Sequence, residues 1–177
     1  MMKIWMIGSV ASGKTTLARK WQQELGIPYF ELDIFVHGPK EDRFKRSKKE
    51  QWHEIKEMDK AGNWIVEGTY RESYHDLFRL ADWVIFLDPP LALRKKRIWR
   101  RYLKQKWGLE KSHYSSNLKM LQAMYRWTKA FEKNRPAFLE MLERDSNHYI
   151  CIQDETELEP LLEHLKDSLS KKMTEKD

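Results

Sequence analysis

Short apolar runs recur along the chain and alternate with longer segments of mixed polarity. Each run is bounded by polar or turn-forming residues, which is the pattern of strands buried on both faces of a sheet. Five runs predict strands, and these lie at residues 3–7, 27–32, 64–67, 82–88 and 148–152. The second strand is predicted to end at Asp33.

The longer segments carry apolar residues three or four positions apart, as amphipathic helices do. They predict helices at residues 15–25, 47–61, 73–81, 91–106, 115–142 and 156–170. Gly26 is expected to cap the first helix, and Ser47 with Glu50 has the spacing of a capping box. Pro136 is expected to interrupt or kink the helix at 115–142. Strands that alternate with helices predict an α/β fold, with a parallel sheet covered by helices on both faces.

The segment between the first predicted strand and the first predicted helix is Gly8-Ser-Val-Ala-Ser-Gly13-Lys14-Thr15. It matches the phosphate-binding pattern G-x-x-x-x-G-K-[ST], in which backbone amides and a helix N-terminus surround a polyphosphate. Lys14 would reach the β- and γ-phosphates, and Thr15 would bind the Mg²⁺ of the nucleotide. The residues expected to contact the nucleotide are Gly8, Ser9, Val10, Ala11, Ser12, Gly13, Lys14, Thr15 and Thr16.

An alternative interpretation of this segment is a glycine- and serine-rich turn with Lys14 in solvent. Because a lysine in the first turn of a helix opposes the helix dipole, that alternative does not explain the residue. We therefore predict a nucleoside-triphosphate site in a P-loop NTPase fold, a three-layer sandwich built on a five-stranded parallel sheet.

Composition narrows the class of protein. The chain has 177 residues, enough for one sizeable core, so residues 1–177 are expected to form one domain. Its net charge of +6 suits a polyanionic ligand, either a nucleotide or a nucleic acid. The single cysteine, Cys151, excludes an intramolecular disulfide, and no apolar stretch approaches the roughly 18 residues of a membrane helix. We expect a cytoplasmic protein with no membrane association.

Charged residues follow several of the predicted strands, at the edge of a parallel sheet where ligands collect. Glu67 is a candidate to hold a water molecule of the Mg²⁺ shell, and the alternative is a solvated strand end. Asp33 is a candidate general base for an acceptor hydroxyl, or else a turn residue. Arg71 is a candidate to bind an anionic group of the acceptor, or else a surface arginine. Asp88 is expected to cap the helix that follows it.

The predicted helix at 91–106 holds the densest charge, with eight basic residues from Arg94 to Lys106. Arg94, Arg97 and Arg101 share one helical face. Arg97 and Arg101 are the candidates to stabilise a transferring phosphoryl group, and the lysines of the helix are expected in solvent. Residues 107–115 are expected to form a short lid-like connector, and residues 36–62 an insertion on the acceptor side.

Three further segments carry a family resemblance: Gly26-Ile-Pro through Glu-Leu-Asp33, Trp64-Ile-Val-Glu-Gly-Thr-Tyr-Arg71 with residues 81–88, and Asn134-Arg-Pro136. With the P-loop, they make the chain resemble the adenylate-kinase-like P-loop small-molecule kinases, and more closely the bacterial DNA topology modulation (FlaR-related) proteins. The resemblance implies ATP and Mg²⁺ as cofactors and a kinase-like site. The chain departs from the nucleoside-monophosphate kinases, whose third strand ends in Asp-Gly-Phe-Pro-Arg, and this departure argues against AMP as the acceptor.

Together these residues predict an ATP- and Mg²⁺-dependent phosphotransferase (a kinase) for a small acceptor, with nucleosides and nucleotides among the candidates. Its expected catalytic residues are Lys14, Asp33, Arg97 and Arg101. The alternative is a nucleotide-regulated protein that binds DNA or modulates its topology, indicated by the basic helix with Trp99 and Tyr102. The helix at 115–142 is a candidate homodimer face, although burial in the core explains its apolar residues equally well.

Overall fold

The computed structural model describes residues 1–37, 45–107 and 118–174. Within these residues, five strands form one sheet in the order β2-β3-β1-β4-β5, and each neighbouring pair is parallel. The strands are β1 (Lys3–Gly8), β2 (Tyr29–Glu31), β3 (Trp64–Gly68), β4 (Trp83–Leu87) and β5 (Tyr149–Ile152). This sheet confirms the predicted α/β class and the five parallel strands.

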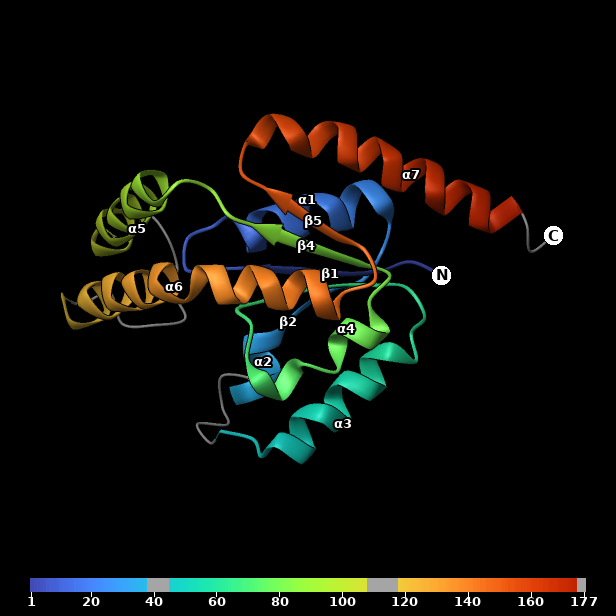
Figure 1. Ribbon diagram of the computed structural model, residues 1–177, viewed down its shortest axis with the longest axis horizontal. Coiled ribbons are helices and arrows are strands. Elements are labelled where there is room, and N and C mark those ends of the chain that lie inside the picture. Colours follow the sequence, from blue (N-terminus) through green and yellow to red (C-terminus); the bar gives the residue numbers. More distant parts are fainter. Residues whose placement is uncertain (38–44, 108–117, 175–177) are drawn as a thin grey trace.

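Helices connect the strands and cover the sheet (Figure 1). The described α-helices are α1 (Lys14–Leu25), α2 (Leu32–His37), α3 (Lys48–Asp59), α4 (Leu77–Leu80), α5 (Leu91–Lys106), α6 (Leu118–Asp145) and α7 (Leu158–Thr174). Two short 3-10 helices, η1 (Glu72–Tyr74) and η2 (Glu155–Glu157), precede α4 and α7 in the described chain. No helix of this part of the chain combines the length and the apolar character that crossing a membrane would need.

Each face of the sheet has its own hydrophobic core, because alternate side chains of a strand point to opposite faces. Trp5 and Ile7 of β1 pack with residues of α2, α3, α4 and α6 on one face. Ile4 and Met6 pack with residues of α1 and α7 on the other. A third cluster around Ile98 joins α5 to α6 beside the loop that follows β1. This loop and α5 therefore lie at the carboxyl ends of the strands (Figure 1).

The strand predicted at residues 27–32 is present, but its predicted bounds and its end at Asp33 are wrong. β2 spans only Tyr29–Glu31 and pairs with β3 alone, because it is the edge strand of the sheet. Leu32 already begins α2, and its side chain is buried against Gly68 at the end of β3. Asp33 consequently lies in the first turn of α2 rather than at the end of a strand.

The predicted interruption of the long helix at Pro136 is also wrong. α6 continues through Pro136 to Asp145, and Phe131 and Phe138 pack against each other across this turn with ring centroids 5.7 Å apart. That packing offsets the hydrogen bond that a proline within a helix removes.

Local signals at the ends of helices were more reliable. Gly26 caps α1 in the left-handed conformation with φ of 64°, and Ser47 and Glu50 form the predicted capping box of α3. The predicted helix at 73–81 is divided between η1 and α4. Residues 38–44 and 108–117, which include part of the predicted insertion and nearly all of the predicted lid-like connector, lie outside the described residues.

Candidate active site

The loop between β1 and α1 has the backbone of a tight turn. Gly13 precedes α1 with φ of 106°, and Ala11 also has a positive φ, 59°. A Cβ at Gly8 would lie 2.7 Å from the carbonyl oxygen of Leu87 and 2.5 Å from Ser12 Oγ, so this position requires glycine. The loop therefore presents the amides of the first turn of α1 at the edge of the sheet, where they can bind an anion.

The remaining loop residues differ in exposure. Ser9 and Ser12 are buried, whereas Thr16 is exposed on α1. Val10 and Ala11 pack against the cluster around Ile98. Ser9 is one of the predicted nucleotide contacts, but its buried hydroxyl group faces other parts of the protein.

Lys14 folds back over the loop. Its Nζ donates hydrogen bonds to the carbonyl oxygen of Ser9 at 2.9 Å and to Ser12 Oγ at 3.4 Å. Burial of the ammonium group lowers the pKa of Lys14, and the nearby Arg101 guanidinium adds to this effect, while Glu67 and Asp33 oppose it. A polyphosphate at the loop would place negative charge beside this ammonium group and so stabilise its charged form.

Thr15 and Glu67 meet at the junction of the loop and β3. Thr15 Oγ1 donates a hydrogen bond of 2.6 Å to Glu67 Oε1, and the Tyr29 hydroxyl donates to the same oxygen at 3.4 Å. Glu67 is only 6% exposed, and this burial raises the pKa of its carboxyl group against the opposing effects of Lys14 and Thr15. Glu31 is the register partner of Glu67 on β2 and brings a second carboxylate to this edge.

Asp33 of α2 and Arg71, which follows β3, form an ion pair. Arg71 Nη2 donates to Asp33 Oδ1 at 3.0 Å, and both side chains remain partly exposed to solvent. The Tyr74 hydroxyl donates to the carbonyl oxygen of Leu32 at 3.2 Å and fixes the start of α2, from which Asp33 projects. The structure thus brings together the two residues that the sequence assigned to an acceptor.

Arg97 and Arg101 approach the loop from α5. Arg97 Nη1 donates to the carbonyl oxygen of Ser12 at 3.0 Å, and its Nη2 pairs with Glu155 of η2. Arg101 lies close enough to Lys14 to lower the pKa of the lysine. The two arginines thus lie beside the loop, and their role toward a phosphoryl group stays a prediction.

Asp88 does not cap α5 as predicted, since the N-terminus of α5 has no side-chain cap. Instead, Asp88 is buried and accepts hydrogen bonds from Arg135, with Oδ2 2.6 Å from Nε and 2.5 Å from Nη2. A salt bridge inside the protein satisfies this carboxylate better than the proline-rich turn that follows it, because Pro89 and Pro90 have no N–H groups to donate.

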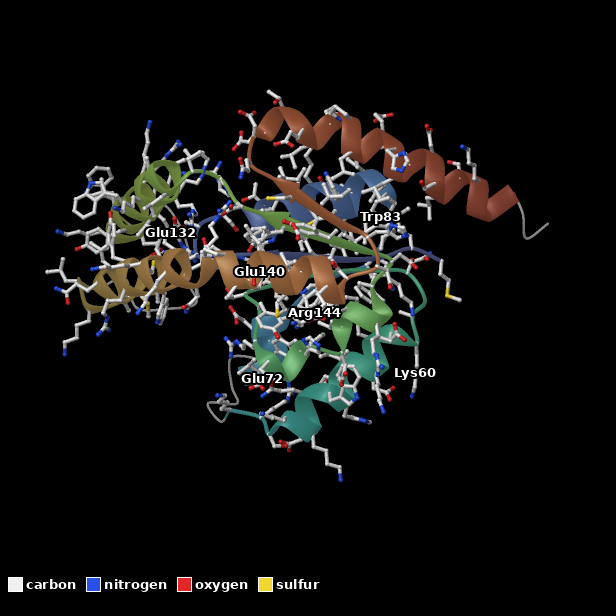
Figure 2. The ribbon with its side chains drawn as sticks, in the orientation of Figure 1. Lys60, Glu72, Trp83, Glu132, Glu140 and Arg144 are labelled. Atoms are coloured by element: carbon white, nitrogen blue, oxygen red, sulfur yellow. The ribbon has the colours of Figure 1, made fainter. Side chains whose placement is uncertain are left out.

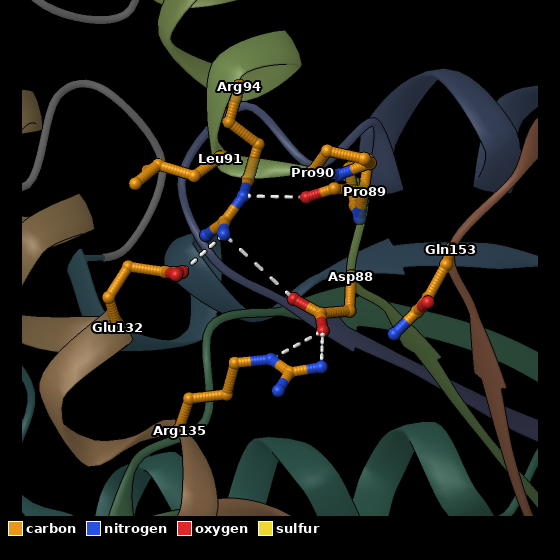
Figure 3. A pocket seen from close by; sticks show the side chains of 8 residues that line it. All are labelled: Asp88, Pro89, Pro90, Leu91, Arg94, Glu132, Arg135 and Gln153. Carbon is orange, nitrogen blue, oxygen red and sulfur yellow. Dashed lines mark hydrogen bonds and ion pairs between the residues drawn. The ribbon is translucent and has the colours of Figure 1, made fainter.

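The same region holds a pocket of about 200 Å³ with polar walls (Figure 3). Its lining residues are Asp88, Pro89, Pro90, Leu91, Arg94, Glu132, Arg135 and Gln153. Arg94 and Arg135 enter it from α5 and α6, and each is paired with a carboxylate (Figure 3). Glu132 belongs to α6, and its side chain pairs with Arg94 of the neighbouring α5 (Figure 2).

Sequence reasoning did not assign a role to four residues of this region: Glu31, Arg94, Glu132 and Glu155. Arg94 shares a helical face with Arg97 and Arg101, and that spacing was the signal that could have found it. Glu132 and Glu155 contact arginines 38 and 58 positions away, so no local pattern marks them. Glu31 could have been found only from the order of the strands.

No family model matches this chain, and no curated protein matches its sequence. Solved structures do match its fold. Shikimate kinase from Acinetobacter baumannii in complex with shikimate has a TM-score of 0.56 at 14% identity, with 97% of this chain and 96% of that chain covered. Deoxyadenosine kinase from M. mycoides with bound dCTP has a TM-score of 0.54 at 17% identity, with 94% of this chain and 100% of that chain covered. A sugar kinase from Janibacter sp. HTCC2649 has a TM-score of 0.50 at 19% identity, with 95% and 91% covered.

The chain therefore has the fold of the P-loop small-molecule kinases. This finding agrees with the wider of the two resemblances drawn from the sequence. None of these three neighbours is a DNA topology modulation protein, and the closer resemblance stays a prediction.

Proposed function

We propose that the protein is an ATP- and Mg²⁺-dependent phosphotransferase that acts on a small acceptor. The observation that carries the proposal is the pairing of Thr15 with the buried carboxylate of Glu67, directly beside Lys14. A carboxylate that is buried at a cost in free energy, next to a hydroxyl and an ammonium group, suits a magnesium–polyphosphate complex. The similar fold of the solved kinase structures supports the same proposal.

The donor side would be built from the loop and α5. The loop amides and Lys14 would bind the β- and γ-phosphates, and the residues from Gly8 to Thr16 would surround the polyphosphate. Thr15 would bind the metal directly, and Glu67 would hold one of its water molecules. Mg²⁺, when bound, would neutralise charge on the β- and γ-oxygens. Arg97 and Arg101 would stabilise the negative charge of the group in transfer.

The acceptor side would be built from Asp33 and Arg71. In the present structure they pair with each other at 3.0 Å, which keeps both side chains oriented toward the same space. An acceptor that carries a hydroxyl and an anionic group would replace both halves of this pair. Asp33 would then accept the proton of the hydroxyl as it attacks, and Arg71 would bind the anion.

The test is ATP turnover by the purified protein with Mg²⁺, screened against pools of nucleosides, nucleotides, sugars and hydroxy acids. We expect one pool to stimulate ADP release, and we expect Lys14→Ala to abolish that release. Lys60→Ala is the matched control, because Lys60 is an exposed lysine that pairs only with Glu57 of its own helix region in the described structure. Tight ATP binding with no stimulation by any pool would overturn the proposal.

A second candidate function is binding of nucleic acid at the outer face of α5. Trp99 is 48% exposed and stacks on Tyr102 with ring centroids 5.6 Å apart. Lys95, Lys96 and Arg100 are exposed on the same helix. Exposed aromatic rings among basic side chains suit the stacked bases and phosphates of a single strand. This function requires an affinity for DNA that falls steeply with salt and does not change in Lys14→Ala.

A further inference from the structure

An arginine is buried directly behind the phosphate-binding loop. The side chain of Arg94 is 2% exposed, and every nitrogen of its guanidinium group has a partner. Figure 3 shows the contacts with Pro89 and Glu132. Nε donates to the carbonyl oxygen of Pro89 at 2.9 Å, Nη1 donates to Ser9 Oγ at 2.7 Å, and Nη2 pairs with Glu132. A buried charge costs free energy unless it is fully bonded, so these three contacts are what make the buried position of Arg94 tolerable.

Ser9 links this arginine to the phosphate site. Its hydroxyl group accepts from Arg94 and lies 3.4 Å from the carbonyl oxygen of Val10, to which it donates. Its own carbonyl oxygen accepts the 2.9 Å hydrogen bond from Lys14. One loop residue therefore connects the buried guanidinium to the lysine that would bind the β- and γ-phosphates.

Glu132 fixes the guanidinium from the other side. It projects from α6, is partly exposed, and belongs to a segment that lies 38 residues further along the chain than Arg94. The ring of Phe131 lies under the guanidinium at 5.6 Å and restricts its plane further. Asp88 is 4.0 Å from Arg94 but is already paired with Arg135, so Glu132 is the carboxylate that orients Arg94.

We propose that Arg94 is a positioning residue that holds the phosphate-binding loop in its nucleotide-binding shape, with Glu132 of α6 fixing Arg94. The inference rests on the proposed function, because it assumes that the loop binds a nucleotide. Arg94 would act without touching the substrate, and its contact with Glu132 would connect α6 to the loop. Arginine suits this position better than lysine, since its planar fork donates from three nitrogens to three separate partners, whereas a lysine has one nitrogen.

The experiment measures the Kd of Mg-ATP by calorimetry, together with the melting temperature, for the wild type, Arg94→Lys, Arg94→Met and Glu132→Gln. The matched control is Lys96→Met, which removes an exposed charge two positions away on the same helix. We expect Arg94→Met to raise the Kd roughly tenfold or more, Arg94→Lys and Glu132→Gln to raise it less, and Lys96→Met to leave it within about twofold. A lower melting temperature with an unchanged Kd in both Arg94 variants would show a role in folding alone and overturn the inference.

If Arg94→Met does not fold, a double-mutant cycle between Arg94→Lys and Ser9→Ala decides the question. Because the two residues share one hydrogen bond, the double variant should bind Mg-ATP no more weakly than the weaker single variant. If the two substitutions raise the Kd of Mg-ATP independently, so that their effects multiply in the double variant, the inference is overturned. A wild-type protein that binds no nucleotide would overturn the proposed function itself, whereas normal binding by the wild type and by Arg94→Lys alike would overturn only the role of Arg94.

Discussion

Glu67 is buried and Lys14 is half-buried beside it, and the loss of hydration disfavours the charged form of each. The pKa of Glu67 is raised and the pKa of Lys14 is lowered for this same reason. Each partly compensates the other, yet burial remains the largest effect on each group. A metal–polyphosphate complex would favour both charged forms, because it brings positive charge to the carboxylate and negative charge to the lysine.

The raised pKa of Glu67 predicts how stability depends on pH. Between the ordinary pKa of a glutamate and the raised value in the folded state, the folded protein binds more protons than the unfolded chain, so its free energy of unfolding falls as pH rises. Glu67→Gln removes this dependence and should be the more stable protein at neutral pH, while Mg-ATP affinity falls. Urea unfolding from pH 4 to 8 would measure the free energy of unfolding of both proteins. The same dependence of this free energy on pH in the wild type and in Glu67→Gln would contradict the prediction.

Arg97 pairs with Glu155, and this exposed contact would compete with an anionic ligand for the arginine. The Glu155 side chain is 75% exposed, so the ion pair is weak. Glu155→Gln should release Arg97 and lower the Kd of Mg-ATP by up to roughly fivefold, because an exposed pair is worth about 1 kcal/mol at most. The control is Glu159→Gln, an exposed glutamate on α7 that pairs with Lys20. A Kd that rises in Glu155→Gln would show that Glu155 helps to bind the nucleotide.

Among single residues, the sequence predicted those that belong to a local pattern. Gly8, Gly13, Lys14 and Thr15 belong to one motif of fixed spacing, and the structure places them together. The partners of Arg94 and Asp88 could not be predicted in the same way. Their partners, Glu132 and Arg135, lie 38 and 47 residues further along the chain, so the contact depends on how α6 packs against α5.

The start of α2 shows how an element places a side chain at the site. Leu32 packs directly against Gly68, and a Cβ at Gly68 would lie 2.8 Å from Leu32 Cβ. This contact sets the position at which the chain leaves β2 and turns into α2. Asp33, the next residue, is thereby directed to Arg71.

Gly68→Ala should therefore disturb the acceptor side of the site. The added methyl group overpacks against Leu32 and should lower the free energy of unfolding by about 1–3 kcal/mol. Acceptor-stimulated ADP release should fall further than Mg-ATP affinity, because the added methyl group meets Leu32, the residue that directly precedes Asp33. Thr69→Ala, at the exposed neighbouring position, is the control for both measurements. Equal losses of turnover and of nucleotide affinity would contradict this placement of Asp33.

The type of nearly every element could be predicted from the sequence, but the boundary of β2 could not. Hydrophobic residues recur from Tyr29 to Val36, with only Glu31 and Asp33 between them, and neither periodicity nor a breaker marks where a strand becomes a helix. The change is made by tertiary contacts, the burial of Leu32 against Gly68 and the hydrogen bond from Tyr74. Pro136 illustrates the opposite error, since aromatic packing on both sides overrides a strong local breaker.

The order of the strands is what assembles the site in the whole molecule. β1 lies at the centre of the sheet, between β3 and β4, so the loop after β1 meets Glu67 of β3 and the start of α5 after β4. Alternation of strands and helices predicted a parallel sheet, and the position of ligands at its carboxyl edge followed from that. The order itself came only from the structure, because hydrophobic patterns do not say which strands are neighbours.

A site contributed by several elements should stabilise the whole fold when it is filled. At a nucleotide concentration about 100 times the Kd, the linkage is worth about 2.7 kcal/mol, or a rise of roughly 5–10 °C in melting temperature for a chain of this size. Mg-ATP should produce this rise in the wild type and in Lys60→Ala, and should produce little in Lys14→Ala at the same concentration. Thermal unfolding followed by circular dichroism would measure it at several nucleotide concentrations. A rise of equal size in Lys14→Ala would mean that the nucleotide binds elsewhere, because the contacts of Lys14 with Ser9 and Ser12 place its ammonium group on the loop and nowhere else.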